Sequence, residues 1–365
     1  MQKGNMGKIQ IHTVANASAE YPRNSEGTML ELNDGRLFLC WIEFPAENNK
    51  PVTDISNARI VGAFSDDEGK SWHHKHIVCE PESEQINVFS PCLVRISNNK
   101  ILLALIILYA DHSHDGYIYM SNDEGNSFSM MGKIWERLPY VFANSVLKKL
   151  TKSQRLILPV NQRVGNLWFP EENYQIGCFY SDNDGVTWNP PTEWLNIPMR
   201  GGMEPHIAEL KNGDLLMVIR TQLGYIYEAL SSDAGITWSE ARPSPLTAPE
   251  SCPEITRIPS TDDLMIVWNN STYLPDFDHF GRRSPLTVAI SKDNGISWQN
   301  FKNIEDAPNG AFSNPAAYVD SQNKVFVTYW ATNYIKPSND RPMIPNPEAI
   351  SLKLAVFSLD YLYDI

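Results

Sequence analysis

The sequence has no excess of positive charge and no long apolar run. Its 365 residues include 30 Lys and Arg against 43 Asp and Glu, which gives a formal net charge of −13. An electric field of that sign repels phosphate backbones and anionic lipid, so we expect neither nucleic-acid nor membrane partners. No stretch is long and apolar enough to read as a membrane-spanning helix.

Cysteine is also scarce, and its spacing is irregular. The five cysteines are odd in number and show no CxxC pattern, which favours neither a disulfide framework nor a zinc site. No glycine-rich phosphate loop and no nucleophile elbow is present, so we predict no cofactor. Residues 1–14 lack the apolar core of a signal peptide, which predicts a cytoplasmic protein unless a signal was removed from the chain.

Helical periodicity is almost absent, and a repeated turn is present instead. Its pattern is a Ser, an acid or amide two residues on, a Gly two further and an aromatic three beyond that. Ser and Asp can hydrogen-bond backbone amides, and Gly tolerates positive φ, so the pattern predicts a structural turn that does not touch substrate. Phe128 for Trp and Asn183 for Asp are variations that a packing role tolerates. The five copies are residues 65–72, 121–128, 181–188, 231–238 and 291–298.

A second repeat runs out of phase with the first. Six times, a polar turn is followed by an apolar strand, at intervals of about 50 to 65 residues, the size of one four-stranded blade. We therefore predict an all-β fold, a six-bladed β-propeller that forms a single domain over residues 1–365. The segment 351–365 is expected to close the ring with the N-terminal segment. The six hairpins are residues 31–41, 95–105, 150–160, 209–219, 257–268 and 319–330.

The segments just before the hairpins indicate where function lies. In a propeller the innermost strands crowd around the axis, and their entry ends form a funnel with the adjacent loops. Polar or charged residues cluster at the start of these segments, and apolar residues follow. This is expected for a solvent-filled opening above a channel that is packed with apolar side chains. They are residues 21–30, 87–94, 141–149, 201–210, 250–258 and 311–319.

With five Asp boxes on a six-bladed plan, the chain resembles the sialidase (neuraminidase) superfamily over nearly its whole length. The segment EPHIAELKNGDLLMVIR is similar to the one in which a Glu opens an inner strand and an Arg ends the next, which assigns those roles to Glu204 and Arg220. The family's first arginine falls at Arg23, where its Arg-Ile-Pro motif is only partly kept. The third falls at Arg283, with Arg282 as the fallback.

The resemblance implies a site for an acidic sugar. Three arginines, Arg23, Arg220 and Arg283, would hold the sugar carboxylate, because guanidinium forks match its planar, bidentate shape. The acid/base carboxylate of sialidases lies on a loop of the first blade, where this chain has Asp54. A surface or salt-bridge role is the alternative for each arginine, and a solvent-exposed turn residue is the alternative for Asp54.

The nucleophile departs from the family's pattern. Sialidases use a Tyr assisted by a Glu, but the expected position reads AFSNP and places Phe312 where the phenol belongs. Phe cannot attack a carbon. Either another group substitutes, with Glu204, Glu254 and Tyr329 as candidates, or the reaction is not retaining sialidase chemistry.

Several other side chains are candidates for lining the pocket. His206 alternates to the same strand face as Glu204, and Glu26 lies near Arg23. His112 and His114 carry metal-compatible donors but lack a third anchored ligand, so no metal site is predicted. The other candidates are Asn144, Arg163, Glu250 and Glu254, with Trp41 and Trp330 as residues that could stack on a sugar.

These observations predict a sialidase-type glycoside hydrolase that releases a terminal acidic sugar, with a glycan as its partner. In this hypothesis Asp54 and Glu204 are catalytic, and the arginines bind substrate with His206, Glu26, Arg163 and Phe312. Two alternatives stay open: a carbohydrate-binding propeller that lost catalysis with the Tyr, and an enzyme of different chemistry on the same scaffold, such as a uronate lyase.

Overall fold

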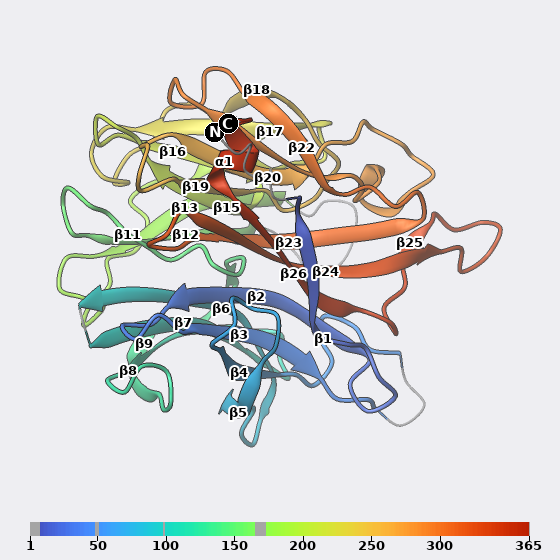
Figure 1. Ribbon diagram of the computed structural model, residues 1–365, viewed down its shortest axis with the longest axis horizontal. Helices are drawn as coiled ribbons and strands as arrows, with labels where there is room; N and C mark the ends of the chain where they lie inside the picture. Colours follow the sequence, from blue (N-terminus) through green and yellow to red (C-terminus); the bar gives the residue numbers. More distant parts are fainter. Residues whose placement is uncertain (1–7, 48–50, 98, 165–172, 365) are drawn as a thin grey trace, which may run out of the picture.

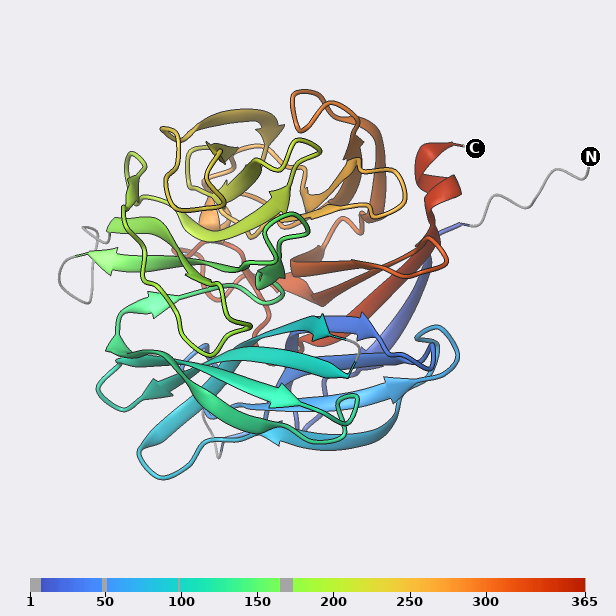
Figure 2. The same ribbon diagram turned by 90° about the vertical axis from the view of Figure 1, so that its left-hand side faces the viewer.

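Six antiparallel sheets surround a central axis and form a six-bladed β-propeller, as predicted (Figures 1 and 2). The computed structural model describes residues 8–47, 51–97, 99–164 and 173–364. The helical elements in these ranges are the short α1 (Leu359–Tyr363) and a single 3-10 turn, η1 (Asp278–Phe280). None of the helices described there is long and apolar enough to cross a membrane.

The blades follow one another along the chain, each running from the innermost strand outward. The first consists of β2 (Arg23–Glu31), β3 (Leu37–Phe44), β4 (Arg59–Ser65) and β5 (His73–Cys79), and the second of β6 (Gln85–Ser97), β7 (Lys100–Tyr109), β8 (His114–Ser121) and β9 (Ser129–Leu138). The third contains β12 (Leu156–Val164) and β13 (Asn173–Ser181), with the short β10 (Tyr140–Val141), β11 (Lys148–Lys149) and β14 (Leu195–Asn196) at its edges.

The remaining blades repeat this plan. The fourth consists of β15 (Met203–Glu209), β16 (Leu215–Arg220), β17 (Tyr225–Ser231) and β18 (Arg242–Thr247), and the fifth of β19 (Glu254–Arg257), β20 (Leu264–Asn269), β21 (Leu286–Ser291) and β22 (Gln299–Glu305). The sixth consists of β23 (Gly310–Val319), β24 (Lys324–Ile335), β26 (Ser351–Ser358) and β1 (Gln10–Ala15), with β25 (Ile344–Pro345) on β24.

The burial of the second strand of each blade explains why the hairpins could be recognised in the sequence as apolar runs. All eight residues of β3 are buried, as are all six of β16 and of β20. A strand covered on both faces by neighbouring sheets needs apolar residues at successive positions instead of an alternating pattern. The six predicted hairpins therefore fall on the junctions between first and second strands.

The N-terminal strand closes the ring. In the sixth blade β1 pairs antiparallel with β26, from Gln10 opposite Val356 to Ala15 opposite Leu352 (Figure 1). The outermost strand of the last blade thus comes from the start of the chain, as predicted. Because this pairing ties the two ends together, the sixth blade is complete only when both are in place.

The five repeated turns lie between the third and fourth strands of blades one to five, and in each of them the serine hydroxyl donates to the acid or amide two residues on. Ser65 Oγ donates to Asp67 Oδ1 at 2.9 Å and accepts from the Gly69 N–H at 2.8 Å. In the third copy the Asn183 side chain still accepts from the Thr187 N–H, at 2.9 Å. Phe128 stacks on Phe38 with ring centroids 6.0 Å apart. Both sequence variations preserve the turn.

Each turn also packs against the preceding blade. Its glycine has φ between 82° and 88°, and a β-carbon there would meet a side chain of that blade. At Gly235 the β-carbon would lie 2.1 Å from Cδ1 of Ile157. The turns therefore hold neighbouring blades in contact. The pairs, turn first, are Gly69 with Leu354, Gly125 with Phe38, Gly185 with Leu102, Gly235 with Ile157 and Gly295 with Leu216.

The Gly235→Ala substitution should lower the free energy of unfolding by about 2–4 kcal/mol, because it combines a positive φ with a clash against the third blade. Gly35→Ala is the matched control, since Gly35 has φ +85° but no neighbour within 4 Å, so it should lose only about 1 kcal/mol. Urea-induced unfolding measures both. Equal losses would show that the contact between blades contributes nothing.

Candidate functional site

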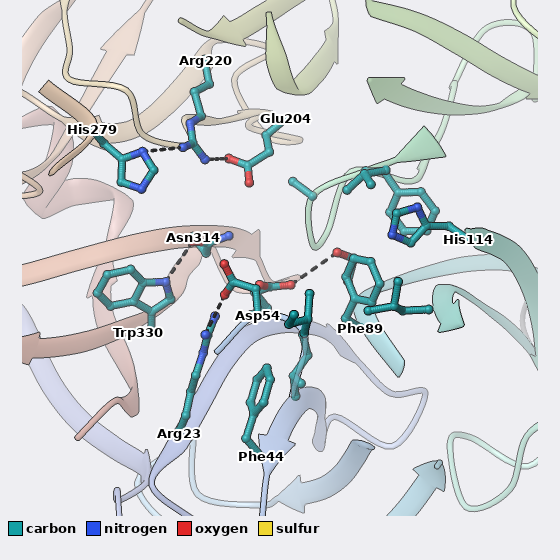
Figure 3. A pocket seen from close by; sticks show the side chains of 18 of the residues that line it. Arg23, Phe44, Asp54, Phe89, His114, Glu204, Arg220, His279, Asn314 and Trp330 are labelled. Carbon is teal, nitrogen blue, oxygen red and sulfur yellow. Dashed lines mark hydrogen bonds and ion pairs between the residues drawn. The ribbon is translucent and has the colours of Figure 1, made fainter. Parts of the chain in front are cut away.

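A cavity of about 400 Å³ lies where the six blades meet (Figure 3). Every blade contributes to its lining, which places the cavity on the axis of the propeller. Because the lining residues come from segments spread over most of the chain, only the closed ring can assemble them. They are Arg23, Glu26, Ile42, Phe44, Asp54, Ile55, Phe89, Ser90, Leu108, His114, Val141, Phe142, Ala143, Tyr174, Glu204, Arg220, His279, Arg283, Asn314 and Trp330.

The cavity combines charged groups with apolar side chains. Arg220, Glu204 and His279 lie across it from Phe44 and Phe89, whereas Arg23 and Asp54 lie on the same side as Phe44 (Figure 3). Blades one to three supply most of the apolar lining, and blade one also supplies Arg23, Glu26 and Asp54. A ligand that fits this lining carries an anionic group together with a less polar surface. The apolar lining is Ile42, Phe44, Ile55, Phe89, Leu108, Val141, Phe142 and Ala143.

The structure brings the three predicted arginines to this one cavity. Arg23 begins β2, and its Nη1 lies 2.6 Å from Asp54 Oδ1. Arg220 ends β16, and its Nη1 donates to Glu204 Oε2 at 2.6 Å. Two of the arginines are therefore held by the two carboxylates that the sequence nominated as catalytic.

Arg283 differs from the other two. Its residue is 9% exposed, and no ion pair or side-chain hydrogen bond to its guanidinium is found in the part of the chain that the structure describes. The guanidinium lies 5.4 Å from the ring centroid of Trp330. Burial and the neighbouring Arg220 lower the pKa of Arg283. Glu204 and Asp278 act in the opposite direction without forming an ion pair with it. A buried cation without a paired carboxylate is costly, so this position favours the binding of an anion.

Backbone strain marks the floor of the cavity. Bulges interrupt the register of β2, β6, β15 and β23, and the residue at each bulge has left-handed φ, between 45° and 55°. For a residue with a side chain this conformation costs about 1–2 kcal/mol. Such strain persists where it positions functional groups. The four residues are Glu26, Ser90, Glu204 and Asn314, and all of them line the cavity.

The three carboxyl groups of the cavity differ in ionisation. Arg23 lowers the pKa of Asp54. Burial alone would raise the pKa of Glu204, but Arg220 outweighs it and lowers that pKa. Burial raises the pKa of Glu26 to about 7, against Arg23 and with help from Asp54 and Glu204. Near neutral pH the cavity therefore holds two carboxylates and one carboxyl group close to its titration point.

His279 and the buried Glu250 organise the charged side, and sequence reasoning missed His279. The imidazole lies on η1 with φ 57°, and its Nδ1 is 3.2 Å from Arg220 Nη2. Burial and Arg283 lower the pKa of His279. Behind it, Glu250 Oε2 lies 3.0 Å from Nδ1 and accepts from Arg200 Nη1 at 3.1 Å. Burial opposes ionisation of Glu250, but His279, Arg220 and Arg200 hold its pKa at about 2.

Phe312 lies elsewhere than predicted. It is 3% exposed and packs in the core, with its ring centroid 6.1 Å from that of Tyr329, so it does not line the cavity. The bulge two residues later turns Asn314 into the cavity instead, where its Oδ1 accepts from Trp330 Nε1 at 2.9 Å. No tyrosine of the sixth blade is among the cavity's lining residues.

His206 also differs from its prediction, because it lies outside the cavity lining and is fully buried. Its Nδ1 is 2.5 Å from Glu254 Oε2, and its Nε2 is 3.3 Å from Cys252 Sγ. Of the proposed nucleophile substitutes, Glu254 is fully buried in this cluster, and the Tyr329 hydroxyl donates to Glu305 at 3.0 Å. Neither reaches the cavity.

The remaining candidates divide between the cavity and its surroundings. Arg163 lines an adjoining space of about 160 Å³ together with His112 and His114. Arg282 stacks over Phe277 and is not part of the lining. No group of three or more His, Cys, Asp or Glu side chains that could hold a metal ion occurs among the described residues. Of the two tryptophans, Trp330 lines the cavity and Trp41 does not, and Asn144 is also outside the lining.

Comparisons with known proteins agree with this architecture. The family described as "BNR repeat-like domain" matches residues 25–327. A Dyadobacter fermentans protein of unknown function is similar at 16% identity and a TM-score of 0.72, over 96% of this chain and 99% of that one. The NanB sialidase of Streptococcus pneumoniae is similar at 13% identity and a TM-score of 0.72, over 97% and 71% of the two chains.

A third structure, the intramolecular trans-sialidase of Ruminococcus gnavus in complex with oseltamivir carboxylate, is similar at 15% identity and a TM-score of 0.70, over 95% of this chain and 99% of that one. Among curated proteins no match is found. At these identities the likeness to the solved structures shows a shared sialidase-like fold.

The Glu250→Gln substitution should lower the free energy of unfolding at pH 7 by about 3 kcal/mol, since it removes the charge of a buried carboxylate that accepts from Arg200 and faces Arg220. The folded pKa of Glu250, about 2, is below its ordinary value of 4.5, so its contribution exists above pH 4.5 and disappears as the pH falls toward 2. Urea unfolding at several pH values measures the difference from the unchanged protein. The exposed Glu348→Gln is the control, and a loss that does not depend on pH would contradict the assignment.

Proposed function

We propose, from the premise that this chain belongs to the BNR repeat-like domain family, that it is a glycoside hydrolase of sialidase type. Its substrate is a glycan with a terminal sugar that bears a carboxylate, and the reaction releases that sugar. The five repeated turns are the Asp boxes of this scaffold and have no part in catalysis.

The observation that carries the proposal is the buried Arg283, which forms no ion pair among the described residues and shares a cavity with Arg23 and Arg220. A sugar carboxylate supplies the missing negative charge in the planar form that guanidinium groups bind best. The apolar side chains of the lining suit the less polar face of the same sugar. The Ruminococcus gnavus structure, of similar fold, was obtained with a carboxylate compound.

Substrate binding itself prepares the catalytic acid. The side chain of Asp54 is 86% exposed on the loop between β3 and β4, so it stands at the open side of the cavity, where the leaving group must exit. A substrate carboxylate competes for Arg23 and adds a negative charge nearby, and both effects raise the pKa of Asp54. The protonated Asp54 then donates to the leaving glycosidic oxygen. Glu204, paired with Arg220, stabilises positive charge at the anomeric carbon.

The position of Phe312 favours one rival function. No phenol from the sixth blade reaches the cavity, so a carbohydrate-binding propeller could keep the arginines without catalysis. In that case calorimetry would detect binding of an acidic sugar, and no glycoside would be hydrolysed. A uronate lyase would instead form an unsaturated product that absorbs ultraviolet light.

The test uses 4-methylumbelliferyl α-sialoside and β-glucuronide as substrates. Arg283→Ala should lower kcat/KM for the accepted substrate by about 100-fold or more, because it removes a charge-assisted contact to the carboxylate. Arg282→Ala is the matched control, since Arg282 stacks on Phe277 outside the cavity lining, and it should change kcat/KM less than about threefold. Equal effects of the two substitutions would contradict the proposed carboxylate site.

For release of the sugar from a glycan, Asp54→Asn should lower kcat by about 100- to 10,000-fold, the usual contribution of a general acid, while sugar binding measured by calorimetry changes little. Activity should recover in part with a leaving group that departs without protonation. Unchanged kcat in Asp54→Asn would remove Asp54 from the mechanism.

A further inference from the structure

Asn314 lines the same cavity as the arginines to which the proposed function assigns the substrate carboxylate, and this inference rests on that function. It lies at the bulge of β23 with φ 48°, a conformation that asparagine tolerates better than most residues. Within residues 311–317 it is the one that is not buried. Its side chain therefore faces the open space of the cavity.

The orientation of the Asn314 amide follows from its contact with Trp330. Its Oδ1 accepts from Trp330 Nε1 at 2.9 Å (Figure 3). An indole N–H can only donate, so the atom facing it is the amide oxygen, and the NH2 group forms the opposite end of the amide. No hydrogen bond from Nδ2 to another described residue is found. The amide thus presents N–H donors to the cavity in a fixed direction.

Trp330 also connects this amide to Arg283. The Arg283 guanidinium lies 5.4 Å from the ring centroid of Trp330, and the N–H of the same ring holds Asn314. The backbone adds a second link, because the Phe312 N–H, two residues before Asn314, donates to the Arg283 carbonyl at 2.8 Å. The guanidinium and the amide therefore border the same part of the cavity.

Two buried asparagines fix the backbone at this position. Asn144 Nδ2 donates to the Gly27 carbonyl at 2.8 Å and to the Asn314 carbonyl at 3.4 Å, which ties β23 to β2. Asn269 Nδ2 donates to the Phe312 carbonyl at 3.0 Å. Both of these asparagines are fully buried. Because the Asn314 donors are held in place before a ligand arrives, binding requires little further ordering.

We propose that Asn314 is a fourth ligand of the substrate carboxylate, with Nδ2 donating to a carboxylate oxygen beside Arg283. A carboxylate only accepts hydrogen bonds, and it does so at about four lone-pair positions. One contact from each of the three guanidinium groups leaves room for one more donor. A neutral donor adds affinity without placing another buried cation beside Arg220 and Arg283. In this proposal β23 supplies a binding group where the resemblance to sialidases implies a nucleophile.

Asn314→Gly tests the proposal, because glycine accepts a φ of 48° and the change removes the donor without adding charge. Calorimetry with N-acetylneuraminic acid, or with glucuronic acid if that is the sugar accepted, should show a Kd raised by about 10- to 100-fold, the usual effect of one hydrogen bond to a charged group. The methyl ester of the same sugar should lose several-fold less affinity, because its carbonyl is a neutral acceptor.

Asn314→Asp is the complementary variant, since it keeps the oxygen that accepts from Trp330 and replaces the NH2 group by a second oxygen. It should weaken binding of the acid more than Asn314→Gly does. The matched control is Asn333→Asp, because Asn333 is an exposed residue of β24 outside the cavity lining. This control adds the same charge and should change the Kd by less than about threefold.

Trp330→Phe separates the two contacts of the tryptophan. Phenylalanine keeps an aromatic ring beside Arg283 and removes the N–H that orients the amide. The change should weaken binding of the acid several-fold in the unchanged protein and have little further effect in Asn314→Gly, which has no amide to orient. Additive losses would show that Trp330 does not act through Asn314.

The outcomes distinguish this inference from the proposed function. If the unchanged protein binds the acid, and Asn314→Gly binds it equally well or loses the same affinity for acid and ester, the role of Asn314 is overturned and the carboxylate site of the arginines stands. If the unchanged protein neither binds nor hydrolyses a derivative of either acidic sugar, the proposed function and this inference fail together.

Discussion

The packing of each blade against the one before it is the contact on which the rest of the structure depends. Five repeated turns place a glycine directly on an apolar side chain of the preceding blade, and β1 completes the sixth blade from the other end of the chain. Because both faces of every sheet are covered, the second strands are buried and mostly apolar, with all residues of β3 and β16 buried. Charged groups are then confined to the edges and to the axis, where inner strands from the whole chain converge.

Two of the three arginines at the axis form ion pairs with carboxylates, and the third does not. Arg23 is paired with Asp54 and Arg220 with Glu204, and Glu250 supports the second pair from behind. Arg283 has no such partner among the described residues, and it stacks on Trp330. The buried guanidinium of Arg283 thus lowers the stability of the free protein, and the binding of an anionic ligand offsets that loss. A rigid ring can sustain this cost because the backbone on both sides of Arg283 is fixed, by Tyr334 and by the Phe312 N–H.

The architecture could be predicted from the sequence because every blade packs in the same way, so the same residue pattern recurs in each blade. Six hairpins and five turns recur with the same spacing, so the ring could be predicted from them, whereas Arg23, Arg220 and Arg283 were nominated by the resemblance to the sialidase superfamily. A bulge in one strand does not recur as a repeat, so its position could not be predicted in this way. A one-residue bulge decides that Asn314 enters the cavity and Phe312 does not, and strand alternation alone cannot reveal it.

A local signal for these bulges nevertheless exists in the chain. Ser90, Glu204 and Asn314 each precede a proline, and Glu26 precedes a glycine. Proline has no N–H to pair with the neighbouring strand, so in a sheet it favours bulges and edges, and glycine tolerates the distorted backbone beside a bulge. Four inner strands that break their ladder at the same level turn polar side chains toward one point. The strain of the floor is thus distributed around the ring, where blade packing holds it in place before any ligand arrives.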